Sequence, residues 1–388
     1  LGKYDFLTRI ASYNDMYMGY VQGAGSNPWT GSIARTLENL PLKWETTDTK
    51  NIGFDFGLFG NHLNGNVNYY LNETRDLLIT RRIAPSAGLD NPTLNVGKMR
   101  NQGFELELNW NDKINDFEYN VGFNISTIAN KVVALANEDQ TIYGVGLKYG
   151  TEHFPTQTKV GKPIGAFYLY QADGIFQSLE EVQAHKNSKG ELLQPNAQPG
   201  DVRFKDMNGD GVIDEDDKTY SGTGIAKVEA NLNLGASYKG FDFSAVIGSA
   251  FGNKIYNGIR YYYEGMNSAS NFLKTTLNAW TPTNTKTDVP RAIYGDPNQN
   301  TRESTRFLEN GDFVRLRQVQ LGYTLPKALS KHIYCDRIRF YVSAENVFTI
   351  TGYSGANPEF SQGVLNSGVD RFTYPFSRSY TVGAQVSF

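Results

Sequence analysis

The sequence has one cysteine, no long apolar run and few charged residues. Cys335 stands alone, so no disulfide forms within the chain, and its polar surroundings indicate no reactive role. No apolar run reaches about 18 residues and mean hydropathy is −0.46, which excludes a bundle of membrane-spanning helices. Charged residues make up 20% of the 388 positions, and the net charge is −3. This balance excludes a basic nucleic-acid binder.

Aromatic residues and glycine are abundant instead. The chain contains 24 Tyr and 23 Phe, with 39 Gly. Because these residues and the aliphatic ones recur along the whole length, the chain is not disordered. Few charges, many aromatics and much glycine together favour an all-β protein.

Strict alternation of apolar and polar residues recurs along the chain. At the C-terminus, Tyr380, Val382, Ala384, Val386 and Phe388 fall on one face of a strand, with polar or small residues between them. The same alternation marks 52–58, 104–110, 117–125, 232–238, 241–247, 319–323 and 338–344. Such strands belong either to a membrane β-barrel, with lipid on the apolar face, or to a soluble sandwich.

The connections favour the barrel, because short and long ones alternate. Short turns at 60–61, 111–116 and 239–240 are separated by long polar segments, at 81–96, 130–225, 249–309 and 351–375. Outer-membrane barrels have short periplasmic turns and long extracellular loops. We therefore expect an antiparallel transmembrane β-barrel wall of about ten strands, with a leading strand at 5–12. The strand-like stretch 165–170 must lie outside the wall, because 130–225 leaves and returns on one side.

The polar faces of these strands would line the lumen. They carry Glu105, Glu107, Glu118, Asn66, Asn68, Asn120, Gln318 and Gln320, and Arg315 and Arg317 add cations near the outer end of one strand. Such a surface suits a polar solute or a polar plug, although solvated strand faces of a sandwich have the same composition.

The segment 206–217 has the spacing of a calcium-binding loop. Hard oxygen ligands are expected at positions 1, 3, 5, 7, 9 and 12 of such a loop. These positions are Asp206, Asn208, Asp210, the carbonyl of Val212, Asp214 and Asp217. Gly211 occupies position 6, where the chain turns sharply, but Asp217 replaces the usual glutamate. We predict a structural calcium ion that braces a long external loop; Mg²⁺ fits less well, and a turn that binds nothing is the alternative.

No catalytic set emerges, so the protein is not expected to be an enzyme. The four histidines form no metal-binding pair, and no nucleophile elbow, P-loop or dinucleotide motif occurs. Glu105 and Glu107 share a strand face at a spacing that a glycosidase pair could use. Tyr261, Tyr263 and Trp280, in an external connection, are weak candidates for contacting substrate, and packing within the loop explains them equally well.

Several motifs together resemble the SusC/RagA family of TonB-linked outer-membrane proteins. They are the stretch from Leu42 to Gly57, Asn95 to Leu106, Gly161 to Gly165 continuing to Phe176, Asp312 to Pro326, and Glu345 to Phe348. The aspartate-rich loop and the terminal Phe388 also resemble features of that family. The resemblance covers nearly all of the chain from about Leu42 onward.

The resemblance implies that residues 1–388 are the C-terminal part of a 22-stranded barrel in the outer membrane of a Bacteroidetes-type Gram-negative bacterium. It implies import of an oligosaccharide or peptide, driven by the TonB complex and assisted by a SusD-like surface lipoprotein. The plug domain and the TonB-contacting segment are expected outside this chain, with the remaining strands. Two other hypotheses stay open: a secreted, calcium-stabilised β-sandwich that binds carbohydrate or acts as an adhesin, and a glycoside hydrolase that uses Glu105 and Glu107.

Overall fold

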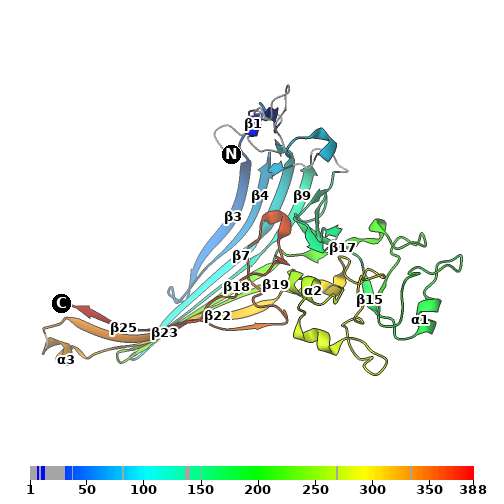
Figure 1. The fold of residues 1–388 in the computed structure, drawn as a ribbon. Helices are drawn as coiled ribbons and strands as arrows, with labels where there is room; N and C mark the ends of the chain where they lie inside the picture. Colours follow the sequence, from blue (N-terminus) through cyan, green and yellow to red (C-terminus); the bar gives the residue numbers. More distant parts are fainter. Residues whose placement is uncertain are drawn as a thin grey trace, which may run out of the picture.

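The computed structural model describes residues 7, 10–13, 31–36, 38–80, 83–135, 140–149, 151–267, 270–332 and 334–388. Two parts make up this structure: a large curved sheet, called the wall below, and a group of folded connections, called the external assembly (Figure 1). Among the described residues, no helix combines the length and the apolar character that crossing a bilayer requires.

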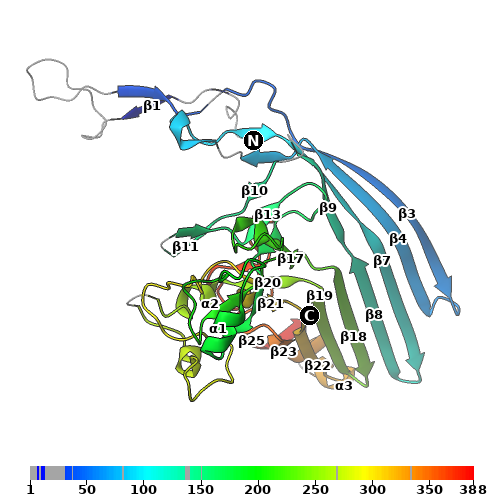
Figure 2. The same cartoon turned by 90° about the vertical axis from the view of Figure 1, so that its right-hand side faces the viewer.

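The wall is a ten-stranded sheet in which every neighbouring pair is antiparallel. Its path runs β25-β23-β22-β19-β18-β8-β7-β4-β3, and β9 pairs with β7 beyond the end of β8. The strands are β3 (Thr46–Leu58), β4 (Leu63–Arg75), β7 (Gly97–Ile114), β8 (Phe117–Thr127), β9 (Ala129–Leu135), β18 (Val228–Tyr238), β19 (Phe241–Phe251), β22 (Phe313–Thr324), β23 (Arg337–Thr351) and β25 (Ser379–Ser387). Figure 2 shows the curvature of this wall.

As the sequence predicted, the short connections lie at one end of the wall and the long connections at the other. At one end, the turns between β3 and β4, β7 and β8, and β18 and β19 are only a few residues long. The turn between β22 and β23 at this end carries a short helix, α3 (Lys327–Lys331). At the other end, the long connections fold into the external assembly (Figure 1).

Of the predicted leading strand at 5–12, the structure describes residue 7 and residues 10–12. Residues 10–12 belong to β1 (Ile10–Tyr13), which pairs with β2 (Gly31–Ala34) in a separate two-stranded sheet and not with the wall. The tenth strand of the wall is therefore β9 in this structure. Nine strands follow one another across the sheet, and β9 extends the line of β8 after an interruption at Ile128.

The external assembly is built from short strands and helices. It contains β5 (Leu78–Thr80), η1 (Pro85–Ala87), β6 (Thr93–Asn95), β10 (Ile142–Tyr143), β11 (Leu147–Tyr149), β12 (Thr151–His153), β13 (Thr156–Thr158), β14 (Ala166–Leu169), β15 (Ala172–Ile175), α1 (Leu179–Ala184), β16 (Val202–Phe204), η2 (Glu215–Asp217), β17 (Thr219–Thr223), β20 (Lys254–Asn257), α2 (Gly258–Tyr263), η3 (Lys274–Asn278), η4 (Thr305–Phe307), β21 (Leu308–Asn310), η5 (Val364–Asn366) and β24 (Val369–Asp370). As predicted, the stretch 165–170 lies outside the wall, because β14 belongs to a small sheet with β10, β13 and β17.

The hydrophobic core lies in the external assembly and not behind the wall. One buried cluster joins three of the long connections: Leu147, Phe167, Leu169, Tyr256, Tyr261, Phe307 and Val369. Because residues far apart in the sequence share this core, these three connections fold as one body.

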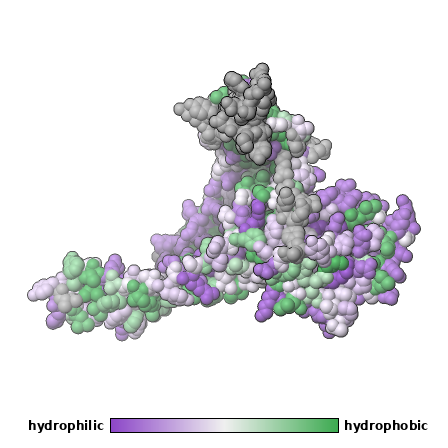
Figure 3. Space-filling view, viewed as in Figure 1, coloured by the Kyte–Doolittle hydropathy of each residue, from purple (hydrophilic) through white to green (hydrophobic). Residues whose placement is uncertain are grey.

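The apolar face of the wall is exposed. Phe104 is 60% exposed, Val382 84% and Phe388 89%, while Phe123 is partly exposed. The register keeps the apolar residues on one face, since Leu108 faces Phe123 and Val342 faces Val382. Apolar residues gather over the end of the wall that carries β23, β25 and α3 (Figure 3). A soluble sandwich would bury this face, so the exposure favours a wall in lipid.

Candidate functional site

Polar side chains form rows across the opposite, inner face of the wall. In one row, Asp55, Asn66, Glu107, Asn124 and Asn231 face one another in register from β3 to β18. The Asn66 amide donates to Glu107 Oε2 at 3.1 Å, and the Asn231 amide donates to Asn124 Oδ1 at 2.9 Å. Since strands alternate their faces, the same alternation that turns apolar residues outward places this row inside.

The inner face joins the external assembly through two arginines of β22. Arg315 and Arg317, which the sequence placed near the outer end of this strand, both donate to the carboxylate of Glu359. Glu359 belongs to the last connection, between β23 and β25. Beside this contact lies a cavity of about 410 Å³ between the wall and that connection.

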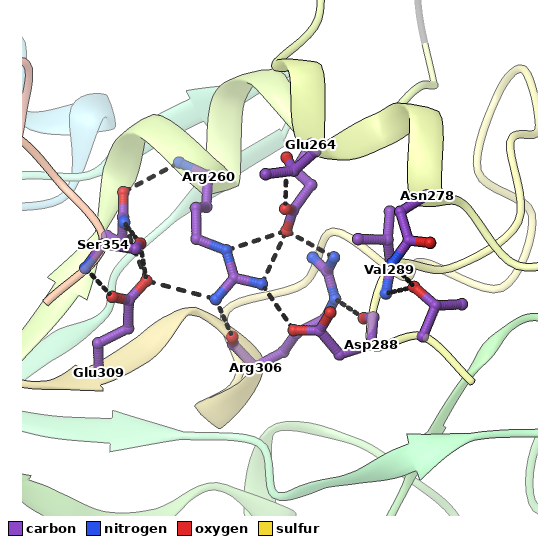
Figure 4. A network of polar contacts seen from close by, with 11 residues as sticks. Arg260, Glu264, Asn278, Asp288, Val289, Arg306, Glu309 and Ser354 are labelled. Carbon is purple, nitrogen blue, oxygen red and sulfur yellow. Dashed lines mark hydrogen bonds and ion pairs between the residues drawn. The ribbon is translucent and has the colours of Figure 1, made fainter. Parts of the chain in front are cut away.

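A network of ion pairs holds the external assembly together (Figure 4). Glu264, which is 1% exposed, accepts from Arg260 Nε at 3.0 Å and from Arg306 Nη2 at 2.7 Å. Arg260 also reaches Glu309, whose other oxygen accepts from the Ser354 backbone N–H at 2.8 Å. Burial alone would lower the pKa of Arg260, but Glu264 and Glu309 outweigh it and raise the pKa. The network therefore ties the connection after β19 to the one after β23.

A second charged group lines a polar cavity of about 600 Å³ in the external assembly. Glu303 is 3% exposed and contacts both Lys218 and His153. Burial raises the pKa of Glu303, but these two partners outweigh burial, so its pKa lies below the ordinary value. Sequence patterns missed this group, since Lys218 and Glu303 are 85 residues apart.

The three aromatic candidates occupy different environments. Tyr261 is 1% exposed and belongs to the hydrophobic core, so its ring does not face solvent in this structure. Trp280 is 8% exposed, and its Nε1 donates to Gln177 Oε1 at 2.9 Å. Tyr263 is 38% exposed and its ring packs against Phe372. Tyr261 and Trp280 are thus buried, and Tyr263 is the one of the three whose side chain is exposed.

The loop 206–217 forms a tight turn closed by its own backbone. Gly211 has φ +91°, in the left-handed region that glycine adopts easily. Both oxygens of Asp206 accept backbone N–H groups of the loop, from Gly209 at 2.6 Å and Gly211 at 2.9 Å. Asp217 is fully buried and accepts from the N–H of Met207 and of Asp214, at 2.6 and 2.8 Å. The predicted position 12 therefore closes the loop.

The remaining predicted ligands of this loop lie nearer the surface. Asn208, Asp210 and Asp214 are exposed, and Asp206 is half-buried. In the described part of the chain, no three carboxylate, imidazole or thiolate groups converge as a metal site requires. The donor types suit calcium, and binding would require these side chains to turn toward a common centre. Calcium binding stays a prediction.

An antiparallel wall with an apolar outer face, a polar inner face and long connections at one end is typical of an outer-membrane β-barrel. Comparison with known proteins identifies the type of barrel. The family described as "TonB dependent receptor-like, beta-barrel" matches residues 8–347. The chain belongs to this family.

Relatives and solved structures agree with this assignment. TonB-dependent receptor P3 of Formosa agariphila is 30% identical over 94% of this chain and 36% of its own length. TonB-dependent receptor SusC of Bacteroides thetaiotaomicron is 27% identical over 90% of this chain and 32% of its own length. The RagAB peptide transporter structure matches 100% of this chain and 39% of its own, with 26% identity and a TM-score of 0.78. The chain thus spans between 32% and 39% of the length of these proteins, and its SusC/RagA resemblance is confirmed.

Proposed function

We propose that the protein imports a nutrient, an oligosaccharide or a peptide, across the outer membrane with energy from the TonB complex. The observation that carries this proposal is the division of the wall into an exposed apolar face and a hydrogen-bonding inner face. Lipid would cover the first, and a polar solute would pass along the second. Membership of the TonB-dependent receptor family and the likeness to a peptide transporter support it.

In this mechanism the wall performs no covalent chemistry. Amides and carboxylates of the inner face, such as Asn66, Glu107 and Asn231, exchange hydrogen bonds with water for hydrogen bonds with the solute. The external assembly surrounds the mouth and limits what enters. TonB-driven rearrangement of a plug would then open the path.

Uptake by cells tests this proposal. A strain that depends on the intact protein for growth on its nutrient should lose uptake when TonB is deleted. Loss of growth on the same nutrient after deletion of the receptor gene is the matched control. Unchanged uptake without TonB would refute TonB-driven import.

A SusD-like surface lipoprotein is the proposed partner at the mouth. The likeness to RagAB structures, solved in "closed-closed" and "open-open" states, supports it. Leu277 and Tyr294 of the external assembly are 84% and 81% exposed, and exposed apolar side chains favour a protein contact. A lipoprotein should co-purify in equal amount from detergent-solubilised outer membranes, and L277D together with Y294D should reduce that amount. A receptor that purifies alone from fresh membranes would contradict the partnership.

Calcium is the proposed brace of the loop 206–217. Exposed Asp210 and Asp214 supply carboxylates, while buried Asp217 holds the loop closed. Added calcium should slow proteolysis of this loop in the intact protein, and magnesium at the same concentration should do so less. The D210N variant should lose the calcium effect while keeping the fold. Equal proteolysis with calcium and with a chelator would show that the loop binds none.

A further inference from the structure

The last connection, between β23 and β25, contacts the inner face of the wall through Glu359 and Asn357. Arg315 Nη1 donates to Glu359 Oε2 at 2.8 Å, and Arg317 Nη2 donates to Glu359 Oε1 at 2.9 Å. Asn357 adds a third contact, because its Oδ1 accepts from Arg315 Nη2 at 2.6 Å. A single carboxylate therefore bridges two guanidinium groups.

The two arginines differ in exposure and in the number of hydrogen bonds that they donate. Arg315 is 3% exposed, and each of its three nitrogens has a partner, the third being Thr349 Oγ1 at 2.8 Å from Nε. The side chain of Arg317 is 39% exposed. Among the described residues it makes a single hydrogen bond, although a guanidinium has five donors. Arg315 therefore anchors Glu359, and Arg317 has donors left for a second acceptor.

A bulge turns Arg317 toward the lumen. The register with β19 passes from Gln318 to Leu316 without a partner for Arg317, and the register with β23 skips the same residue. Bulges re-aim a side chain at such positions. Gly248 on β19 leaves room for it, since a Cβ there would lie 2.2 Å from Arg317 Nε. The guanidinium thus lies across the inner face of the wall.

The free side of Arg317 faces the cavity of about 410 Å³ described above. Asn231 on β18 and Asn253, just beyond β19, contribute neutral hydrogen-bonding residues to the lining of the cavity, and Glu229 adds one carboxylate. Glu229 has no cationic partner in the part of the chain that the structure describes. The charged groups are therefore Arg317 with its partner Glu359 on one side and Glu229 on another.

We propose that Arg317 is a binding subsite for an anionic group of the imported solute, a carboxylate, sulfate or phosphate. In the absence of solute, the carboxylate of Glu359 occupies the position of that anionic group. When the solute binds, Glu359 releases Arg317 and keeps its hydrogen bond to Arg315. A planar guanidinium fork suits such oxyanions, and a carboxylate already occupies part of it. Glu229 repels a second anion, so the subsite selects a solute with one anionic group here. The inference rests on the proposed import.

Hydrogen exchange of the intact protein in detergent tests the subsite, with inorganic sulfate as the probe. Sulfate should compete with Glu359 for Arg317 and loosen the connection. Amides of residues 354–362 should exchange about threefold faster in sulfate than in chloride at equal ionic strength, while the β18–β19 turn stays unchanged. Equal exchange in the two salts, with a folded barrel by gel mobility, would overturn the proposal.

Variants locate the effect at Arg317. R317Q should abolish the difference between sulfate and chloride, E359Q should exchange fast in both salts, and E229Q should respond at lower sulfate. R339Q is the control, because it breaks the pair of Arg339 with Asp242 elsewhere on the wall and should keep the sulfate effect. A sulfate effect that survives in R317Q would refute the subsite. This assay needs no uptake, so failure of TonB-driven import and failure of the subsite give separate results.

Discussion

The wall and the external assembly bury opposite kinds of surface. Val382 on the wall is 84% exposed, whereas Phe167 in the external assembly is fully buried. On the wall, polar groups such as Asn66 and Glu107 meet across the inner face. Apolar side chains are therefore exposed on the wall and buried in the external assembly, as expected if lipid covers the wall and water surrounds the external assembly.

The largest expected effect is the difference in stability lost when a phenylalanine is removed from the external assembly or from the wall. Phe167→Ala removes a fully buried ring from the external assembly and should cost about 3–5 kcal/mol of its stability. Phe104→Ala on the wall should cost far less, because Phe104 is 60% exposed and leaves no cavity. Proteolysis of the external assembly measures the loss in Phe167→Ala, and urea unfolding of the wall measures the loss in Phe104→Ala. Similar losses in both variants would show that Phe104 is also a core residue.

A charge on the outer face should give the next largest effect. Val382→Arg places a guanidinium among acyl chains and should destabilise the barrel by about 2–4 kcal/mol in lipid vesicles. Thr381→Arg, the neighbouring position on the inner face, is the matched control and should change stability little. Urea titration of the refolded protein in vesicles compares them. Equal losses of stability in Val382→Arg and Thr381→Arg would contradict an outer face that lies in lipid.

The smallest effect is a pH dependence confined to the external assembly. Because Lys218 and His153 hold the pKa of Glu303 below its ordinary 4.5, its ionised form stabilises the fold above that pH. This contribution should be lost as pH falls through the lowered pKa of Glu303. Proteolysis of the external assembly should therefore increase in acid before the wall unfolds. E303Q should raise proteolysis at neutral pH and remove part of the acid dependence; an unchanged acid profile would contradict the assignment.

Local alternation made the wall predictable. The stretches 117–125, 232–238 and 241–247 match β8, β18 and β19, because a period of two specifies both strand and face. The inner position of Arg315 and Glu107 follows from the same pattern. Connection length then predicted which end carries the external assembly.

Long-range contacts were beyond this kind of inference. The bond between Arg315 and Glu359 joins residues 44 apart, and nothing in the pattern links them. The bulge at Arg317 interrupts the alternation, so a period of two does not place this side chain. For Tyr261 the sequence left two interpretations open, contact with solute and packing within the loop, and its ring lies in the buried cluster.

Spin labelling tests the central claim most directly. A nitroxide on a cysteine introduced at Val382 should be more accessible to oxygen, which dissolves in acyl chains, than to a water-soluble nickel chelate. The same label at Thr381 should show the reverse preference, because that residue faces the aqueous interior. Equal preference for the nickel chelate at both positions, in protein reconstituted in vesicles, would contradict a wall whose apolar face lies in lipid.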